Sequence, residues 1–94
     1  MPEEIWTLDY EAEGVQVEEL KQAMHDFLPK LEAEKRIEQM KVMYIRAGNP
    51  FLMRVDIAIS GNPFDPPWPS IFQETQIGQP KVFFAQPELS IAKR

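Results

Sequence analysis

Cysteine is absent from this chain of 94 residues, and histidine occurs once, at His25. Without Cys the chain forms no disulfide and no thiolate metal site, and one His provides no pair of imidazole ligands. The acidic residues do not match a calcium-binding loop, and the four glycines are isolated and form no phosphate-binding loop. We therefore expect neither a metal nor a cofactor.

Long apolar runs are also missing. The longest, such as residues 42–45, are far shorter than the roughly 20 residues that a membrane-spanning helix needs. The opening Met1-Pro2-Glu3-Glu4 lacks the basic and apolar regions of a secretory signal. Because the lack of Cys also fits a reducing compartment, we expect a cytoplasmic protein with no membrane partner.

Basic residues are absent from the first 20 positions, although the whole chain carries ten Lys and Arg against 15 Asp and Glu. The carboxylates of this segment belong to Glu3, Glu4, Asp9, Glu11, Glu13, Glu18 and Glu19. The basic residues elsewhere are scattered, whereas nucleic-acid binding needs a concentrated basic surface, so we expect no nucleic-acid partner. Two interpretations of the acidic segment stay open: a solvated surface that keeps the protein soluble, or a face for a basic protein partner.

The hydrophobic pattern predicts one domain, residues 1–94, with a strand followed by a helix. Residues 5–10 alternate, which places Trp6, Leu8 and Tyr10 on one face of a strand. Residues 17–31 have helical periodicity, with Pro29 expected to bend the helix or start a fresh turn. The apolar stripe of this helix consists of Val17, Leu20, Met24, Phe27, Leu28 and Leu31.

After the helix the apolar period becomes two. Residues 40–45 and 51–59 alternate on either side of a turn at 47–50, which predicts a β-hairpin. Residues 61–69 contain four prolines and predict a loop, and residues 70–76 fit a short helix or an irregular strand. Residues 81–85 predict a short edge strand bounded by Pro80 and Pro87, and the tail at 89–94 stays open.

This order of elements predicts an α+β fold with one main amphipathic helix on a small antiparallel sheet, in the order β-α-β-β-(Pro-rich loop)-β. The alternative is a ferredoxin-like split βαβ fold with a degenerate second helix. In either case the stripe of the main helix should pack on the sheet face that carries Val55, Ile57 and Ile59.

Few residues in the sequence are suited to catalysis. His25 lies outside the apolar stripe of its helix, which is typical of a surface histidine. A serine nucleophile would have to be Ser60, Ser70 or Ser90, and none of them lies in a G-x-S-x-G turn. We therefore predict no catalytic residues and no enzyme activity.

The segment Phe64-Asp65-Pro66-Pro67-Trp68-Pro69 is the candidate partner-binding site. Aromatic side chains on a backbone that Pro restricts lose little entropy on binding, and Asp65 would orient a basic partner. The candidate residues are therefore Phe64, Asp65 and Trp68. The alternative interpretation is that Phe64 and Trp68 fold back as a lid on the core.

The function that these features favour is a small, non-enzymatic module that binds another protein. The alternative is a small-molecule-binding or enzyme-subunit domain whose pocket forms in an oligomer. A homo-oligomer is compatible with both.

Overall fold

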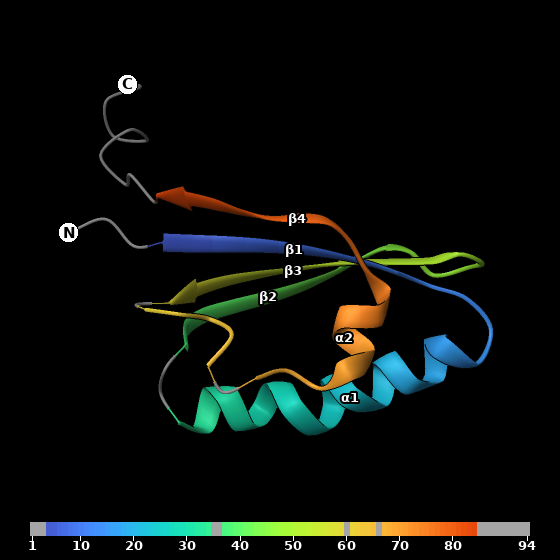
Figure 1. Cartoon of the computed structure of the whole chain (residues 1–94), viewed down its shortest axis with the longest axis horizontal. Helices are drawn as coiled ribbons and strands as arrows, with labels where there is room; N and C mark the ends of the chain where they lie inside the picture. The colour runs from blue at the N-terminus through green and yellow to red at the C-terminus, as the bar shows by residue number, and fades with distance from the viewer. Residues whose placement is uncertain (1–3, 35–36, 60, 66, 85–94) are drawn as a thin grey trace.

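Two helices lie on one side of an antiparallel sheet (Figure 1). The computed structural model describes residues 4–34, 37–59, 61–65 and 67–84. The strands are β1 (Glu4–Ala12), β2 (Ile37–Arg46), β3 (Phe51–Ile59) and β4 (Gln76–Phe84), and the helices are α1 (Val15–Ala33) and α2 (Ser70–Thr75). The predicted α+β class is confirmed.

The strand order across the sheet is β2-β3-β1-β4, and each neighbouring pair is antiparallel. β1 and β2 are therefore parallel to each other, joined through α1 and separated by β3. β3 and β4 are likewise parallel, joined through α2 and separated by β1. Two parallel units interleaved in this way form the ferredoxin-like split βαβ arrangement. The topology thus matches the alternative architecture predicted from the sequence, with a second helix of only six residues.

The core lies between the sheet and α1, where strand alternation places every second side chain. Leu8 of β1 pairs with Val55 of β3, and both side chains are fully buried. The predicted packing of the helix stripe on β3 is confirmed, because the buried stripe residues share one cluster with the inner face of β3. Partly buried Val17 and Phe27 pack against this cluster. Its remaining members include Leu20, Met24, Leu28, Leu31, Ile57 and Ile59.

Helix α1 begins at Val15, earlier than the predicted segment, and continues through Pro29 to Ala33. A proline in a helix interior removes the hydrogen bond to the carbonyl four residues earlier, which here belongs to His25. Both residues are exposed to solvent. A water molecule can therefore donate a hydrogen bond to the His25 carbonyl in place of the missing N–H, and the helix continues through this proline.

Strand β4 begins earlier than predicted, because Pro80 lies inside it instead of before it. An edge strand tolerates proline where the missing N–H would face solvent. The register of β4 against β1 shifts between Thr7 and Asp9, close to Gly78, which adopts a φ of 70°. The predicted edge position is confirmed, whereas Ala85 and the tail at 89–94 lie outside the described residues.

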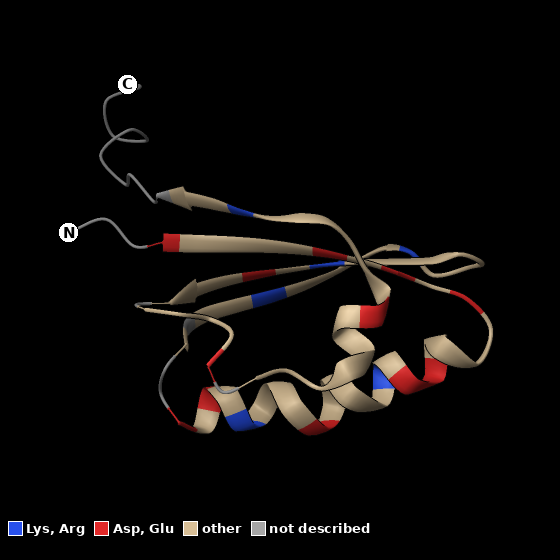
Figure 2. Ribbon diagram, in the orientation of Figure 1, with Lys and Arg blue, Asp and Glu red and all other residues tan. Residues whose placement is uncertain are grey.

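The face of the sheet opposite the helices carries charged side chains. Across β1 and β3, the Arg54 guanidinium Nε donates to the Asp9 carboxylate over 2.7 Å. Acidic residues also occur on α1 and in the connection that precedes it (Figure 2). None of the helices in the described part of the chain has both the length and the apolar character needed to cross a bilayer.

Candidate functional site

The Pro-rich connection between β3 and α2 begins with a tight turn at Asn62. The Asn62 side-chain oxygen accepts a hydrogen bond from the Phe64 backbone N–H at 2.9 Å. The Asn62 carbonyl accepts another from the Asp65 N–H at 3.3 Å. Asn stabilises turns in this way because its short side chain reaches the backbone two residues later. The turn fixes the backbone from which Phe64 and Asp65 project.

Trp68 closes the same connection from the other end. Its indole N–H donates to the Pro63 carbonyl at 2.8 Å, and only 6% of the residue is exposed. Its ring lies 5.5 Å from Phe27 of α1 and 5.0 Å from Phe72 of α2, measured between centroids. The connection is therefore attached to both helices through one buried aromatic side chain.

A row of aromatic contacts extends from Trp68 to β1. Phe64 lies 6.0 Å from Trp68 and 5.8 Å from Trp6, with an edge-to-face orientation toward Trp6. At the other end, Phe72 meets Tyr10 edge-to-face at 5.5 Å. Such aromatic pairs contribute about 0.5–1.5 kcal/mol each beyond the area that they bury. These rings form a preorganised wall between the sheet and α2.

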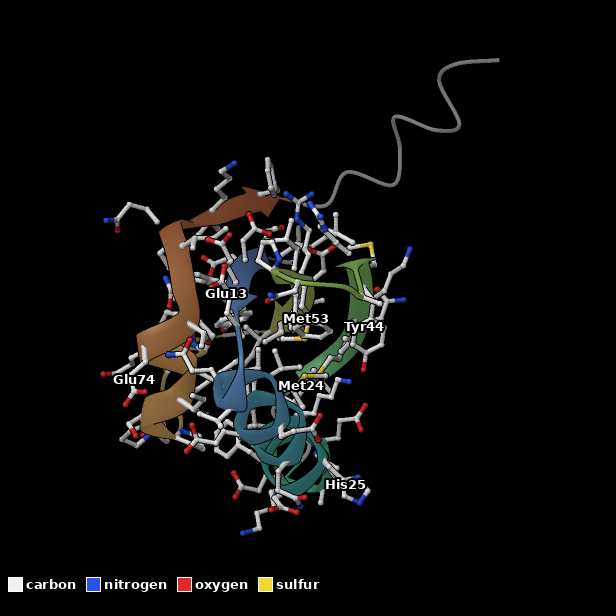
Figure 3. All side chains as sticks on the ribbon, turned by 90° about the vertical axis from the view of Figure 1, so that its right-hand side faces the viewer. Glu13, Met24, His25, Tyr44, Met53 and Glu74 are labelled. Carbon is white, nitrogen blue, oxygen red and sulfur yellow. The ribbon has the colours of Figure 1, made fainter. Side chains whose placement is uncertain are left out.

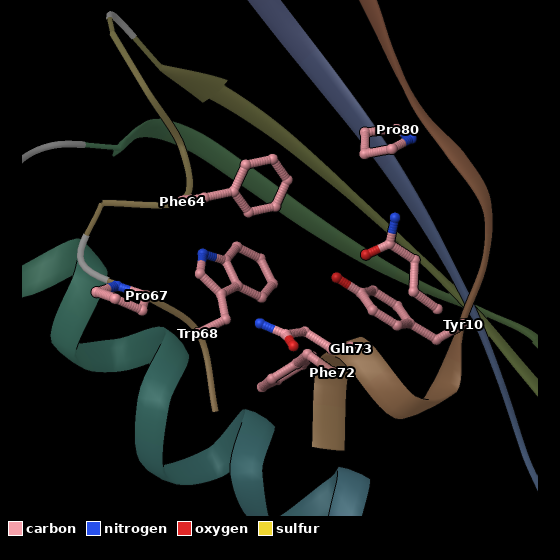
Figure 4. Close-up of a pocket in the computed structure, with 8 residues that line it drawn as sticks. Tyr10, Phe64, Pro67, Trp68, Phe72, Gln73 and Pro80 are labelled. Carbon is pink, nitrogen blue, oxygen red and sulfur yellow. The ribbon is translucent and has the colours of Figure 1, made fainter. Parts of the chain in front are cut away.

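A pocket of about 280 Å³ opens against this aromatic wall (Figure 4). Its lining combines four aromatic rings with two prolines and two glutamine side chains, and it contains no charged residue. The lining residues are Tyr10, Phe64, Pro67, Trp68, Phe72, Gln73, Gln76 and Pro80. Apolar walls with a few polar groups are the usual composition of a small-ligand pocket. We refer to this site as the aromatic pocket.

The Tyr10 hydroxyl points from β1 toward Trp68 (Figure 4). Burial, and secondly the neighbouring Asp9 carboxylate, raise the pKa of the Tyr10 phenol above its usual range. The group is therefore a neutral phenol at physiological pH and offers one hydrogen-bond donor. Together with the amides of Gln73 and Gln76 it supplies the polar groups of the pocket.

The structure brings two of the three predicted site residues together. Phe64 and Trp68 both line the aromatic pocket, while Asp65 lies beside Phe64 with its side chain exposed. Trp68 is buried, as the alternative interpretation of a lid on the core expects. Its indole therefore forms a wall of the pocket and does not project into solvent. The role of the three residues in binding a partner stays a prediction.

The other half of the pocket was not predicted from the sequence. Tyr10 and Phe72 belong to apolar patterns that indicate only burial, and Gln73 has no distinguishing pattern. The pocket arises because the topology places β4 beside β1 and α2 above their ends. A longer periodic pattern over α2 would have been the only local sign that a helix covers this part of the sheet, and α2 has just six residues.

His25 and Ser70, which were considered for catalysis, do not line the aromatic pocket. His25 is exposed on α1 and lies in a groove between α1 and β2, away from the aromatic pocket. Ser70 begins α2, whereas Ser60 and Ser90 fall outside the described residues. Among residues 4–34, 37–59, 61–65 and 67–84, no three His, Asp or Glu residues are grouped as metal ligands would be.

Comparison of the chain with protein-family models, with curated proteins and with solved structures finds no match.

Proposed function

We propose that this domain is a non-enzymatic protein-binding module that holds one large apolar side chain of its partner in the aromatic pocket. The observation that supports this proposal is the pocket of about 280 Å³ lined by Tyr10, Phe64, Trp68 and Phe72. An apolar cavity of about 150 Å³ accepts benzene, so this pocket has room for a ring as large as an indole. Anchor side chains in preformed pockets dominate the energetics of many interfaces.

The rigidity of the pocket favours binding of this kind. Trp68 is fixed by its hydrogen bond to Pro63, and Phe64 by the turn at Asn62. A preformed site orders few of its own side chains on binding, so more of the contact energy appears as affinity. Asp65 is exposed beside Phe64 and favours a basic residue next to the anchor of the partner. The expected ligand is therefore an aromatic or large aliphatic side chain flanked by Lys or Arg.

Peptide display against the full chain tests this proposal. We expect selected peptides to share one large apolar residue close to a basic residue. Binding should then be measured by calorimetry on two matched variants of α2. Gln73→Trp places a large ring at a lining position, whereas Glu74→Trp places the same ring at an exposed neighbour outside the lining.

The predicted result is loss of peptide binding in Gln73→Trp and retained binding in Glu74→Trp. Phe64→Ala should weaken binding by about tenfold or more, since interface aromatics commonly contribute over 1 kcal/mol. Equal binding by Gln73→Trp and the wild type would show that selected peptides use another surface, and the proposal would be wrong.

A second candidate, a small-molecule-binding domain, is favoured by one specific observation. The aromatic pocket is formed by a single chain, so a free ligand would need no oligomer to create the site. Its lining fits a neutral aromatic compound with one polar group for Tyr10, Gln73 or Gln76. Calorimetric titration with indole and phenol, compared with the affinity of the selected peptides for the same pocket, separates the candidates. Free indole or phenol that binds as tightly as the best peptide would favour the small ligand, whereas much tighter peptide binding would favour the protein-binding module.

The proposed setting is the cytoplasm, and the proposed partner is neither a nucleic acid nor a membrane. A net charge of −5 opposes binding to phosphates, and the chain has no cysteine that would depend on an oxidising compartment. Fractionation of native host cells with a specific antibody would test the location.

A further inference from the structure

The two edges of the sheet differ in how well they are protected against pairing with another strand. β4 contains Gly78 and Pro80 and a register shift, all of which interrupt edge pairing. β2 contains neither Gly nor Pro across its ten residues. Between its two register shifts it pairs with β3 regularly from Gln39 to Tyr44. The β2 edge is therefore the edge without Gly or Pro, and its segment from Gln39 to Tyr44 is regular although it carries Lys41 and is bounded by register shifts.

An apolar groove accompanies this edge. It has a volume of about 290 Å³ and lies between β2 and α1. Its floor consists of Met24, Leu28, Met40 and Val42, with Tyr44 at one end. Tyr44 is 58% exposed and the next residue, Ile45, is 56% exposed. Tyr44 and His25 lie on the same side of the molecule, where β2 and the outer surface of α1 meet (Figure 3).

We propose that the β2 edge binds a second copy of this chain, so that two β2 strands pair antiparallel and form one continuous sheet. The two-fold axis passes through Val42, which pairs with Val42 of the second copy. On the helix side, Tyr44 of each copy then lies opposite Met40 of the other, and each Tyr44 covers the groove of its partner. An axis at the neighbouring Lys41 is disfavoured, because it would oppose two ammonium groups.

The charges along the groove are complementary under this symmetry. Lys21 in the first half of α1 and Glu32 in its last turn both line the groove. The Lys21 ammonium lies 5.4 Å from the Phe51 ring centroid, and that ring contacts Tyr44, so Lys21 marks the Tyr44 end. A two-fold axis at Val42 exchanges the ends of the groove. It therefore places Glu32 of the second copy at the end that carries Lys21, so each end of the paired grooves has one charge of each sign.

The size of the contact predicts a reversible dimer. Pairing about Val42 covers residues 40–44 of each copy and one short groove, and we expect this contact to bury less surface than the roughly 1,200–2,000 Å² of stable interfaces. We therefore expect dissociation in the micromolar range, with dimers at high protein concentration. The dimer contact uses the sheet edge opposite the aromatic pocket, so its test does not depend on the proposed function.

Sedimentation velocity over a range of concentrations tests the proposal with variants of Met43, which faces away from the helices and lies opposite Lys41 of the second copy. Met43→Lys places like charges opposite each other twice in the dimer, and the dissociation constant of the dimer should rise about tenfold. Met43→Glu creates two favourable pairs with Lys41, so the dissociation constant should fall. Phe83→Lys on β4 is the control, since it adds the same charge at the other edge of the sheet.

A charge exchange on α1 provides an independent measurement should Met43→Lys unfold the domain. Lys21→Glu and Glu32→Lys should each weaken the dimer, and the double variant should restore it. A chain that stays monomeric up to about 1 mM would overturn the proposal. A dimer that responds to Phe83→Lys and is unaffected by the Met43 and α1 variants would also overturn it.

Discussion

The indole N–H of Trp68 donates to the carbonyl of Pro63 over 2.8 Å and so joins the two ends of the Pro-rich connection. Both partners are buried, with Trp68 6% exposed. A buried carbonyl that lost this donor would remain without a hydrogen bond, which costs about 1–3 kcal/mol. The same side chain forms a wall of the aromatic pocket, so the stability of the domain and the shape of its proposed site depend on one residue.

Trp68→Ala should therefore destabilise the domain strongly. Truncation of a buried Trp typically costs about 3–5 kcal/mol, and the loss of the hydrogen bond to Pro63 adds to the cavity. Urea unfolding followed by far-UV circular dichroism measures the change. Phe83→Ala is the control, because Phe83 is 55% exposed and its loss should change stability by less than about 0.5 kcal/mol. Equal stability of the two variants would argue against the lid role of Trp68.

Leu20→Ala tests the packing of α1 on the sheet. Leu20 is fully buried in the core cluster, and a buried Leu replaced by Ala costs about 2–5 kcal/mol. The thermal midpoint should fall steeply, because a domain of this size has only about 5–15 kcal/mol in total. Val15→Ala, at an exposed position in the same helix, should leave the midpoint nearly unchanged. A large effect of Val15→Ala with none of Leu20→Ala would contradict the observed helix face.

The sequence predicted those features that depend on local periodicity. The alternation of Trp6, Leu8 and Tyr10, the stripe of α1 and the hairpin of β2 and β3 each follow from neighbours in the chain. Strand order does not follow from local periodicity, because the insertion of β1 between β3 and β4 depends on contacts between residues far apart in sequence, and it was predicted only as the ferredoxin-like alternative. The aromatic pocket depends on that order, so Phe64 and Trp68 were identified while Tyr10 and Phe72 were not.

Local exceptions account for the boundaries that the sequence misplaced. Pro29 was expected to bend the helix or start a fresh turn, and Pro80 was expected to precede the last strand, but both lie inside a continuous element. Each is tolerated because its missing N–H belongs to a position that solvent or a sheet edge can accommodate. Proline therefore predicts a boundary only where the lost donor would have been buried.

Gly78→Ala should destabilise the domain by about 1–2 kcal/mol. Gly78 adopts a φ of 70° in β4, and an L-residue pays roughly that cost in the left-handed region. No neighbouring atom within 4 Å would meet the added methyl group, so the effect isolates the backbone strain. Gly48→Ala is the matched control, since it also meets no atom within 4 Å and has no positive φ. Similar urea midpoints for both variants would show that β4 relaxes around the new residue.

Stability should decline at alkaline pH because Tyr10 must lose its proton in a buried site. Burial, and secondly the Asp9 carboxylate, raise the pKa of the folded-state Tyr10 phenol above the usual value of 10.0. For a raised pKa, the unfolded chain releases the proton first as pH increases. The stabilising contribution is therefore complete below about pH 10, and it is lost above that pH at up to about 1.4 kcal/mol per unit. Urea unfolding at intervals from pH 8 to 11 measures this loss, and phenolate absorbance reports the ionisation directly.

Tyr10→Phe removes the titrating group while keeping the ring that contacts Phe72, so its stability should depend less on pH over the same interval. Lysines titrate in this range too, and only the difference between the two proteins is assigned to Tyr10. Parallel pH profiles for the wild type and Tyr10→Phe would mean that the phenol ionises without cost and that the aromatic pocket is more open to water than its lining indicates.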